Sequence, residues 1–96
     1  ERGATRAVFR RMAHPYTRAL LAASPGALDA PLAAGRRLAT IPGSVPDPLH
    51  RPAGCVFATR CPRVQDDCLP VQPAEGRVDP GHAAACLHPH REETPL

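Results

Sequence analysis

Four cysteines are the residues of this chain whose type and spacing could do chemistry. They follow the pattern C-x5-C-x6-C-x17-C, and all lie in the second half of the 96 residues: Cys55, Cys61, Cys68 and Cys86. Grouped thiols either pair as disulfides or bind a metal ion or an iron–sulfur cluster. Few large apolar residues surround them, which argues against four unrelated buried thiols.

The spacing leaves more than one chemistry open. Two disulfides would suit an exported protein, but nothing in the sequence indicates export. Zinc sites usually contain a C-x2–4-C pair, and no such pair occurs here. A [4Fe–4S] cluster accepts longer intervals, and Cys61-Pro62 is similar to the Cys-Pro step of bacterial ferredoxins. Spacing alone therefore leaves two disulfides, a structural zinc ion and a [4Fe–4S] cluster as alternatives.

Residues near the cysteines could support such a centre. His82 lies four positions before Cys86 and could itself be a ligand. A single histidine near a cysteine more often donates a hydrogen bond to sulfur or to the backbone, so we predict that supporting role for His82. Arg60, directly before Cys61, is predicted to support the cysteine site in the same way, without being a ligand.

Other function classes lack their motifs. The sequence contains no GxxxxGK[ST] phosphate loop and no GxSxG nucleophile motif. The adjacent carboxylates, Asp66-Asp67 and Glu92-Glu93, are typical of solvated loops and tails. We therefore expect no enzyme in these residues alone. The net charge is only +3 and 3% of residues are aromatic, which gives few platforms for stacking bases and argues against a nucleic-acid partner.

Two helices are expected to begin the chain. Thr5, Val8, Phe9 and Met12 share one helical face, which predicts a helix over 5–12. Pro15 suits the first turn of a second helix, which should end at Ser24-Pro25-Gly26.

The rest of the chain is punctuated by most of its 13 prolines and 7 glycines. Such a composition buries little apolar area and requires a staple. We predict a small, loop-rich α+β fold in which a metal or cluster staples an irregular segment. The expected pieces are a linker with a helical turn over 28–33, strands over 38–41 and 82–87, an extended stretch over 41–54 and a loop over 69–81.

Several strings resemble one family. HPYTRALLAASP, residues 14–25, and IPGSVPDPLHRPAGCVFATRCP, residues 41–62, resemble the C-terminal extension of the ATP-binding subunit of oligopeptide/dipeptide ABC importers. Cys68 and the GHAAACL run complete that family's cysteine pattern. Two departures are Ala13, where members usually have proline, and Thr59, where the Phe-x-Pro-Arg-Cys form has proline.

The resemblance implies a division of the chain and a set of partners. Residues 1–13 would end the nucleotide-binding domain, 14–37 would be the HPY helix and linker, 38–90 the four-cysteine domain, and 91–96 a disordered tail. ATP and Mg²⁺ would bind only in the nucleotide-binding domain. The implied partners are that domain, a second ATPase subunit and the membrane permeases, at the cytoplasmic face of the bacterial inner membrane.

The resemblance also implies a site. Members of the family hold a [4Fe–4S] cluster, and the matching ligands here are Cys55, Cys61, Cys68 and Cys86. His14, Pro15 and Tyr16 would be an architectural joint against the nucleotide-binding domain or the second ATPase. The alternative interpretation is a free-standing zinc-binding module that contacts a protein or nucleic acid.

Overall fold

A computed structural model describes residues 1–24 and 40–93 of the chain. The regular elements, in order, are β1 (Arg2–Gly3), α1 (Thr5–Arg10), α2 (Pro15–Ala22), the 3-10 turns η1 (Ala58–Arg60) and η2 (Asp66–Cys68), β2 (Gly76–Asp79) and β3 (His82–Ala84). Two short helices, three short strands and long loops make a small α+β fold, as the sequence predicts. None of the helices in the described ranges is long and apolar enough to cross a membrane.

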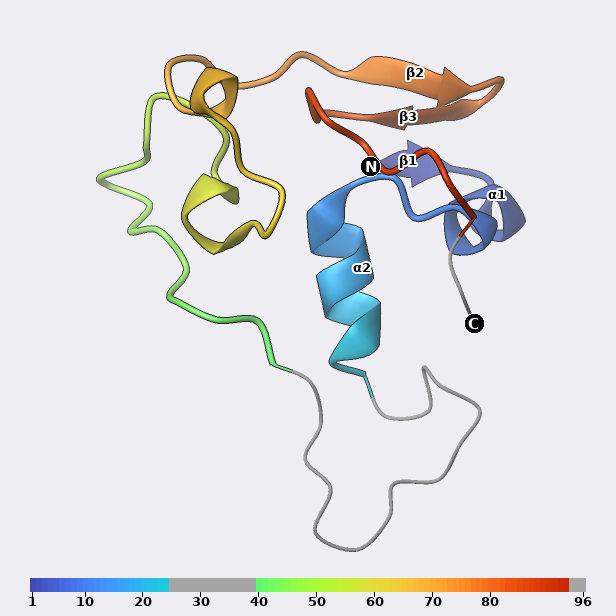
Figure 1. Ribbon diagram of the computed structural model, residues 1–96, viewed down its shortest axis with the longest axis horizontal. Coiled ribbons are helices and arrows are strands. Elements are labelled where there is room, and N and C mark those ends of the chain that lie inside the picture. The colour runs from blue at the N-terminus through green and yellow to red at the C-terminus, as the bar shows by residue number, and fades with distance from the viewer. Residues whose placement is uncertain (25–39, 94–96) are drawn as a thin grey trace, which may run out of the picture.

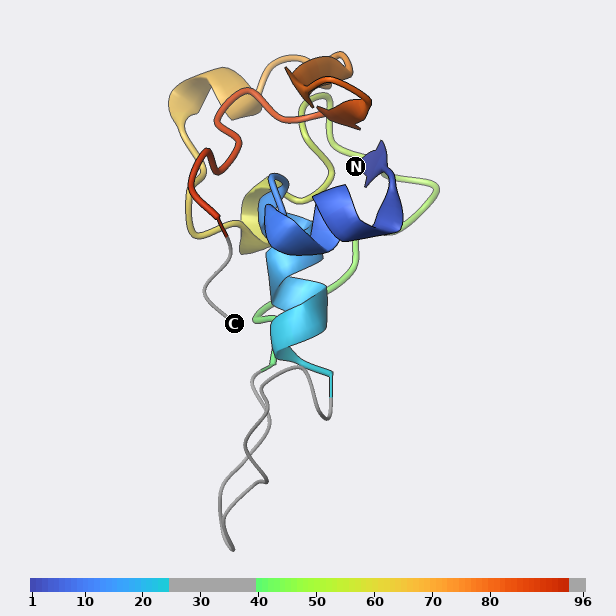
Figure 2. The ribbon, with the colours of Figure 1, turned by 90° about the vertical axis from the view of Figure 1, so that its right-hand side faces the viewer.

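The sheet joins the two ends of the chain. Its strand order is β1-β3-β2, with both pairs antiparallel, so that Arg2 lies opposite Ala83 and Gly76 opposite Ala84. Figure 1 shows the sheet at the top, α1 and α2 beneath it, and the segment with η1 and η2 beside α2. In the turned view the sheet again lies at the top, with α1 and α2 below it (Figure 2).

The hairpin from β2 to β3 corrects the loop predicted over 69–81. Pro80 and Gly81 form its turn, and Gly81 has φ +74, which glycine adopts without strain. This turn lets Gly76–Asp79 pair with His82–Ala84, and a register shift follows Arg77. The strand predicted over 82–87 is therefore present, but it ends at Ala84.

The first helix is shorter than the prediction of 5–12. It ends at Arg10, because Arg11 leaves the helical region with φ −138 and ψ 89. That bend turns Met12 and Ala13 into the core, where both are buried. The second helix begins at Pro15, as predicted, and the backbone bends at Ser24.

The predicted strand over 38–41 is not found in its described part. Thr40 and Ile41 carry no strand pairing, and the other two residues lie outside the described ranges. The helical turn predicted over 28–33 also lies outside them. The stretch from 41 to 54 is irregular, which agrees with its prolines.

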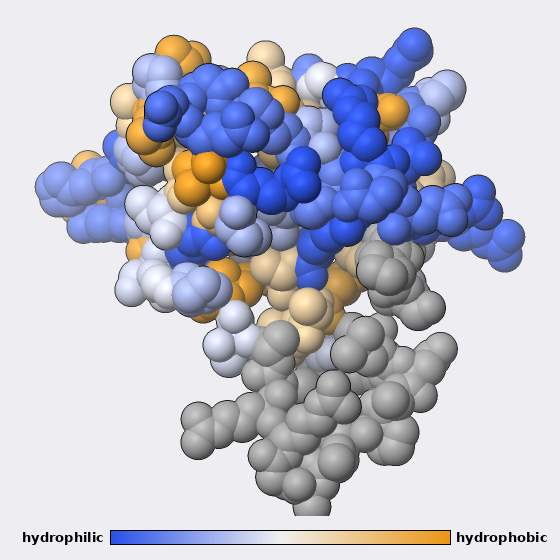
Figure 3. Space-filling model, viewed as in Figure 1, coloured by the Kyte–Doolittle hydropathy of each residue, from blue (hydrophilic) through white to orange (hydrophobic). Residues whose placement is uncertain are grey.

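The buried core is small. It consists of Met12, Ala13, Phe57, Ala58, Cys68, His82 and Ala84. These residues come from both ends of the chain, so the core lies between the helices, the sheet and the η turns. Hydrophilic residues dominate the upper right of this face, over the sheet and α1. Hydrophobic residues are more frequent toward the left of the same view (Figure 3).

Candidate cofactor site at the four cysteines

All four cysteines line one small, almost entirely apolar pocket. Cys55 precedes η1, Cys61 ends it, Cys68 closes η2, and Cys86 follows β3. None is in a disulfide; Cys68 is buried and the other three are half-buried. The fold thus brings together the four residues that the sequence predicts as ligands, although Cys86 lies far from the others in the chain.

The thiols influence one another electrostatically. Burial raises the pKa of Cys61 and of Cys86, and neighbouring thiols raise both pKa values further. For Cys86, those neighbours are the other three cysteines. Four thiolates this close repel one another, so a cation bound among them would relieve the repulsion.

Backbone N–H groups point at two of the sulfurs. The N–H of Arg63 donates to Sγ of Cys61 at 3.3 Å, and the N–H of His88 donates to Cys86. Both bonds lower the pKa of the thiol that accepts them, against the effect of burial. Hydrogen bonds of this kind stabilise the thiolate form, which is the form that binds metals.

Gly54 allows the backbone before Cys55 to lie close to the backbone of Cys68. It is not among the site residues predicted from the sequence. A Cβ at Gly54 would lie 2.2 Å from the carbonyl oxygen of Cys68, so no larger residue fits this approach. The N–H of Cys55 donates to that same carbonyl at 2.9 Å. The glycine directly before Cys55 was the signal available in the sequence, because glycine permits a close backbone approach.

His14 and Pro15 line the same pocket, and Tyr16 follows them in α2. Nδ1 of His14 accepts the N–H of Tyr16 at 3.0 Å and so caps α2, while Pro15 is buried in the first turn. The His14 ring also bonds to the backbone of Ala85, next to Cys86. Burial lowers the pKa of His14, which favours the neutral ring.

Aromatic contacts join α2 to the segment between Cys55 and Cys61. The rings of Tyr16 and Phe57 are 5.0 Å apart between centroids, and His14 lies 6.2 Å from Phe57. The guanidinium of Arg60 lies 5.2 Å from the Phe57 ring and 5.7 Å from the Tyr16 ring, which are cation–π distances. Arg60 therefore supports the site by packing across these rings.

His82 takes a partner that the sequence did not indicate. Its Nε2 lies 2.5 Å from Oε2 of Glu1, and the two side chains are 1% and 2% exposed. Its Nδ1 has no hydrogen-bond partner among the described residues. His82 therefore binds neither a sulfur nor a backbone group there, in contrast to the predicted bond. The reason is the sheet, which places β3 beside residue 1.

Another histidine, His88, lies beside the cysteines instead. His88 Nε2 lies 2.7 Å and 2.9 Å from the two carboxylate oxygens of Asp67, and Asp67 Oδ1 lies 3.7 Å from Sγ of Cys68. The bond from His88 is the main cause that lowers the pKa of Asp67 and keeps this carboxylate ionised. The sequence indicated neither residue, because the two are far apart along the chain.

The fold and site define a small cysteine-rich α+β domain whose four thiols converge beside a helix that begins with His-Pro-Tyr. The chain belongs to the family described as the C-terminal region of oligopeptide/dipeptide transporters, whose model matches residues 1–68.

Relatives cover most of this chain. It is 42% identical over 80 residues to a protein of Brucella ovis named as a peptide import ATP-binding protein, and 44% identical over 86 residues to one of Brucella melitensis. It is 38% identical over 79 residues to the protein named as the oligopeptide transport ATP-binding protein YkfD of Bacillus subtilis. These alignments cover 83%, 90% and 82% of this chain but 24% of each relative. The chain thus spans about a quarter of the length of these relatives.

Proposed function

We propose that this chain is the C-terminal regulatory or structural domain of the ATP-binding subunit of a peptide ABC importer, and that its four cysteines hold a [4Fe–4S] cluster. The observation that carries the cluster proposal is the convergence of Cys55, Cys61, Cys68 and Cys86 on one apolar pocket. Thiolate ligands in an apolar, partly closed pocket are the usual surroundings of such clusters.

The spacing of the cysteines along the chain supports a centre larger than one ion. Zinc sites usually contain a C-x2–4-C pair, and no such pair occurs here. Tetrahedral zinc with Zn–S bonds of about 2.3 Å would require every pair of sulfurs at about 3.8 Å. A cluster binds each cysteine through a different iron, so wider separations suit it. The four residues therefore fit a [4Fe–4S] cluster better than a single four-cysteine zinc ion.

The chain's own groups would hold and tune the cluster. When bound, it would supply one-electron redox chemistry or a rigid cross-link between the loops. The N–H groups of Arg63 and His88 would donate to ligand sulfurs, and hydrogen bonds to sulfur raise the reduction potential of a cluster. Phe57, buried between Cys55 and Cys61, would keep water from one side of the pocket.

The proposed role places ATP hydrolysis outside these 96 residues. The names of the relatives support a parent subunit that binds ATP and Mg²⁺ in a nucleotide-binding domain. That subunit would pair with a second ATPase and act on permeases from the cytoplasmic face of the bacterial inner membrane. The exposed Tyr16 and Leu20 of α2, 39% and 44% accessible, would dock on the nucleotide-binding domain or the second ATPase.

Anaerobic reconstitution with ferrous iron and sulfide tests the cluster. We expect a brown protein with four irons and four sulfides per chain, and a Cys86→Ser variant that loses both. A Val71→Ala variant is the control: Val71 is exposed and lies outside the pocket, so this variant should load normally. A colourless chain that takes up one zinc ion through all four cysteines would overturn the proposal.

A further inference from the structure

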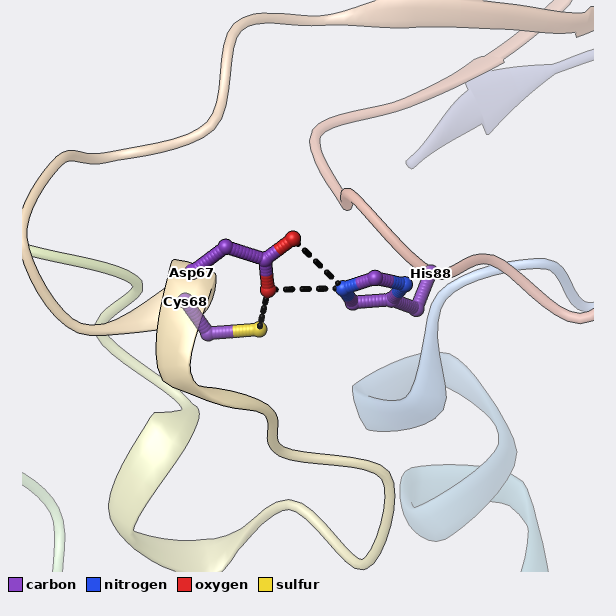
Figure 4. A group of neighbouring side chains, drawn as sticks. All are labelled: Asp67, Cys68 and His88. Carbon is purple, nitrogen blue, oxygen red and sulfur yellow. Dashed lines mark hydrogen bonds and ion pairs between the residues drawn. The ribbon is translucent and has the colours of Figure 1, made fainter.

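Three different metal-ligand types meet beside the four-cysteine pocket. Asp67, Cys68 and His88 each offer one ligand atom, and these atoms all lie within 4.8 Å of one another. Asp67 and Cys68 come from η2, and His88 comes from the segment after β3. All three side chains point toward one another (Figure 4). They are the one such group of three or more found in residues 1–24 and 40–93.

The ligand types select a class of ion. One thiolate, one imidazole and one carboxylate are a mixed set that suits borderline ions such as Zn²⁺. The carboxylate and the thiolate together carry two negative charges, which match a divalent cation. The hard oxygen set that Mg²⁺ or Ca²⁺ requires is missing from this group.

The distances are close to those of a shared ion. Zn–S and Zn–O bonds of about 2.3 and 2.1 Å in tetrahedral geometry place sulfur and oxygen about 3.6 Å apart. Asp67 Oδ1 and Cys68 Sγ lie 3.7 Å apart. Nitrogen and oxygen ligands of the same ion lie about 3.4 Å apart. The 2.7 Å hydrogen bond between His88 and Asp67 would therefore lengthen when an ion replaces its proton.

One side of the group is open to solvent. The side chain of Asp67 is 55% exposed and that of His88 is 25% exposed, whereas Cys68 is buried. An ion could enter from this side, and a water molecule could take the fourth position, as in zinc sites with three protein ligands. The Nε of Arg63 donates to the carbonyl of His88 at 3.1 Å, which restrains the segment that carries the imidazole.

We propose that Asp67, Cys68 and His88 form a mononuclear site for a zinc-type divalent cation. Cys68 belongs both to this site and to the four-cysteine set, so zinc and the cluster compete for its thiolate. The competition, though not the zinc site itself, rests on the proposed cluster. The structure thereby assigns Asp67 and His88 a role in deciding which metal the domain carries.

The test is anaerobic reconstitution of the chain with iron and sulfide, with and without one equivalent of zinc chloride. With zinc, we expect the wild type to bind one zinc and to lose iron. His88→Gln should weaken zinc binding at least tenfold in a calorimetric titration and keep its iron in the presence of zinc. His90→Gln is the matched control, because His90 bonds Glu92 rather than Asp67, and it should behave as the wild type.

A second variant separates the two zinc sites that the chain could offer. Cys55→Ser removes a cluster ligand outside the proposed zinc site, so its zinc affinity should stay within about threefold of the wild type. Cobalt in place of zinc should show the charge-transfer absorption of one thiolate rather than four. If His88→Gln proves misfolded by circular dichroism, Asp67→Asn and the cobalt spectrum of the wild type decide.

Two results would overturn the zinc site: unchanged zinc affinity in folded His88→Gln and Asp67→Asn, or a loss in Cys55→Ser as large as in His88→Gln. The imidazole of His88 is not a proposed cluster ligand, and His88→Gln keeps the backbone N–H that bonds Cys86, so the variant should load iron normally when zinc is absent. A failure of the cluster proposal would therefore appear there, separately from a failure of the zinc site.

Discussion

The first 24 residues and the cysteine-bearing residues 54–90 are held together by different means. In the first region, α1 and α2 form their own backbone bonds, and the His14 side chain caps the start of α2. The buried Glu1 carboxylate accepts the N–H groups of Ala13 and His14. The second region has two three-residue turns and one hairpin. Its larger apolar residues are mostly exposed, with Leu69 at 56% and Val71 at 68%.

The two regions therefore obtain their stability from different sources. The helical region satisfies much of its backbone within its own helices and shares the small core with the cysteine region. Between residues 54 and 80, the buried residues are Gly54, Phe57, Ala58, Cys68 and Pro73. The apolar area that they bury is too small to offset the loss of conformational entropy when this backbone becomes ordered. Ligation of its thiols is the natural remaining contribution, as in other small metal domains.

Removal of a ligand should therefore produce the largest effect, and only in the cysteine region. Without added zinc, Cys55→Ser should lose the cluster, and amide signals of residues 54–90 should broaden while those of α2 stay dispersed. Apparent binding free energies of structural zinc domains, about 10–16 kcal/mol, indicate the scale of such a loss. Nuclear magnetic resonance of the reconstituted chain checks it. Dispersed signals throughout the metal-free variant would contradict this division of the molecule.

The sequence predicted the residues of the site better than their surroundings. Cys55, Cys61 and Cys68 are close in the chain and their pattern is dense, and Pro15 after His14 is a local helix start. Such signals need no knowledge of the fold. The pairing of Glu1 with His82 and of Asp67 with His88 depends on which segments the sheet brings together. No local pattern encodes contacts over such separations, so both were missed.

The hairpin shows that a local signal can also be overlooked. Asp79-Pro80-Gly81 has proline followed by glycine at the centre of a turn, which is typical of a type II turn. The many prolines nearby made the whole stretch resemble a loop, and β2 was not predicted. Its consequence is functional, because the hairpin orients β3 and hence the approach of Cys86.

The joint between the two regions should show the next largest effect. Phe57 is buried and contacts the rings of Tyr16 and His14 as well as Arg60. Phe57→Ala should cost about 3–5 kcal/mol, the usual range for a buried aromatic residue. Thermal unfolding of the iron-loaded chain measures it. Val71→Ala, at an exposed position, is the control and should change the midpoint little.

A smaller loss is expected where the backbone itself sets the distance between two ligands. Gly54→Ala places a Cβ 2.2 Å from the Cys68 carbonyl oxygen, so the backbone segments at residues 54 and 68 must move apart. We expect a cost of about 1–3 kcal/mol, in the range of overpacked sites. Slower cluster assembly, followed by visible absorption, should accompany it. Gly76→Ala, with no atom nearer than 4.0 Å, is the matched control.

The smallest expected effect lies in the helical region and depends on pH. Burial raises the pKa of Glu1, but bonds from Thr17, Ala13, His82 and His14 outweigh it and lower the pKa below its ordinary value of 4.5. A carboxyl group whose pKa is lower in the folded state stabilises the fold above the ordinary value. That contribution is lost as the pH falls from 4.5 through the folded pKa.

Glu1→Gln should remove this part of the acid sensitivity. The amide oxygen can still accept the N–H groups of Ala13 and His14, but the charge beside His82 is gone, at a cost of about 1 kcal/mol near neutral pH. Melting midpoints measured from pH 7 to pH 3 should therefore converge for the two proteins as the pH falls. Because the proposed cluster would be lost in acid, the comparison follows the far-ultraviolet circular dichroism signal of α1 and α2 in both proteins, prepared alike. A gap between the two midpoints that stays constant down to pH 3 would show that the Glu1 charge does not stabilise the fold, and that the contact with His82 contributes through packing alone.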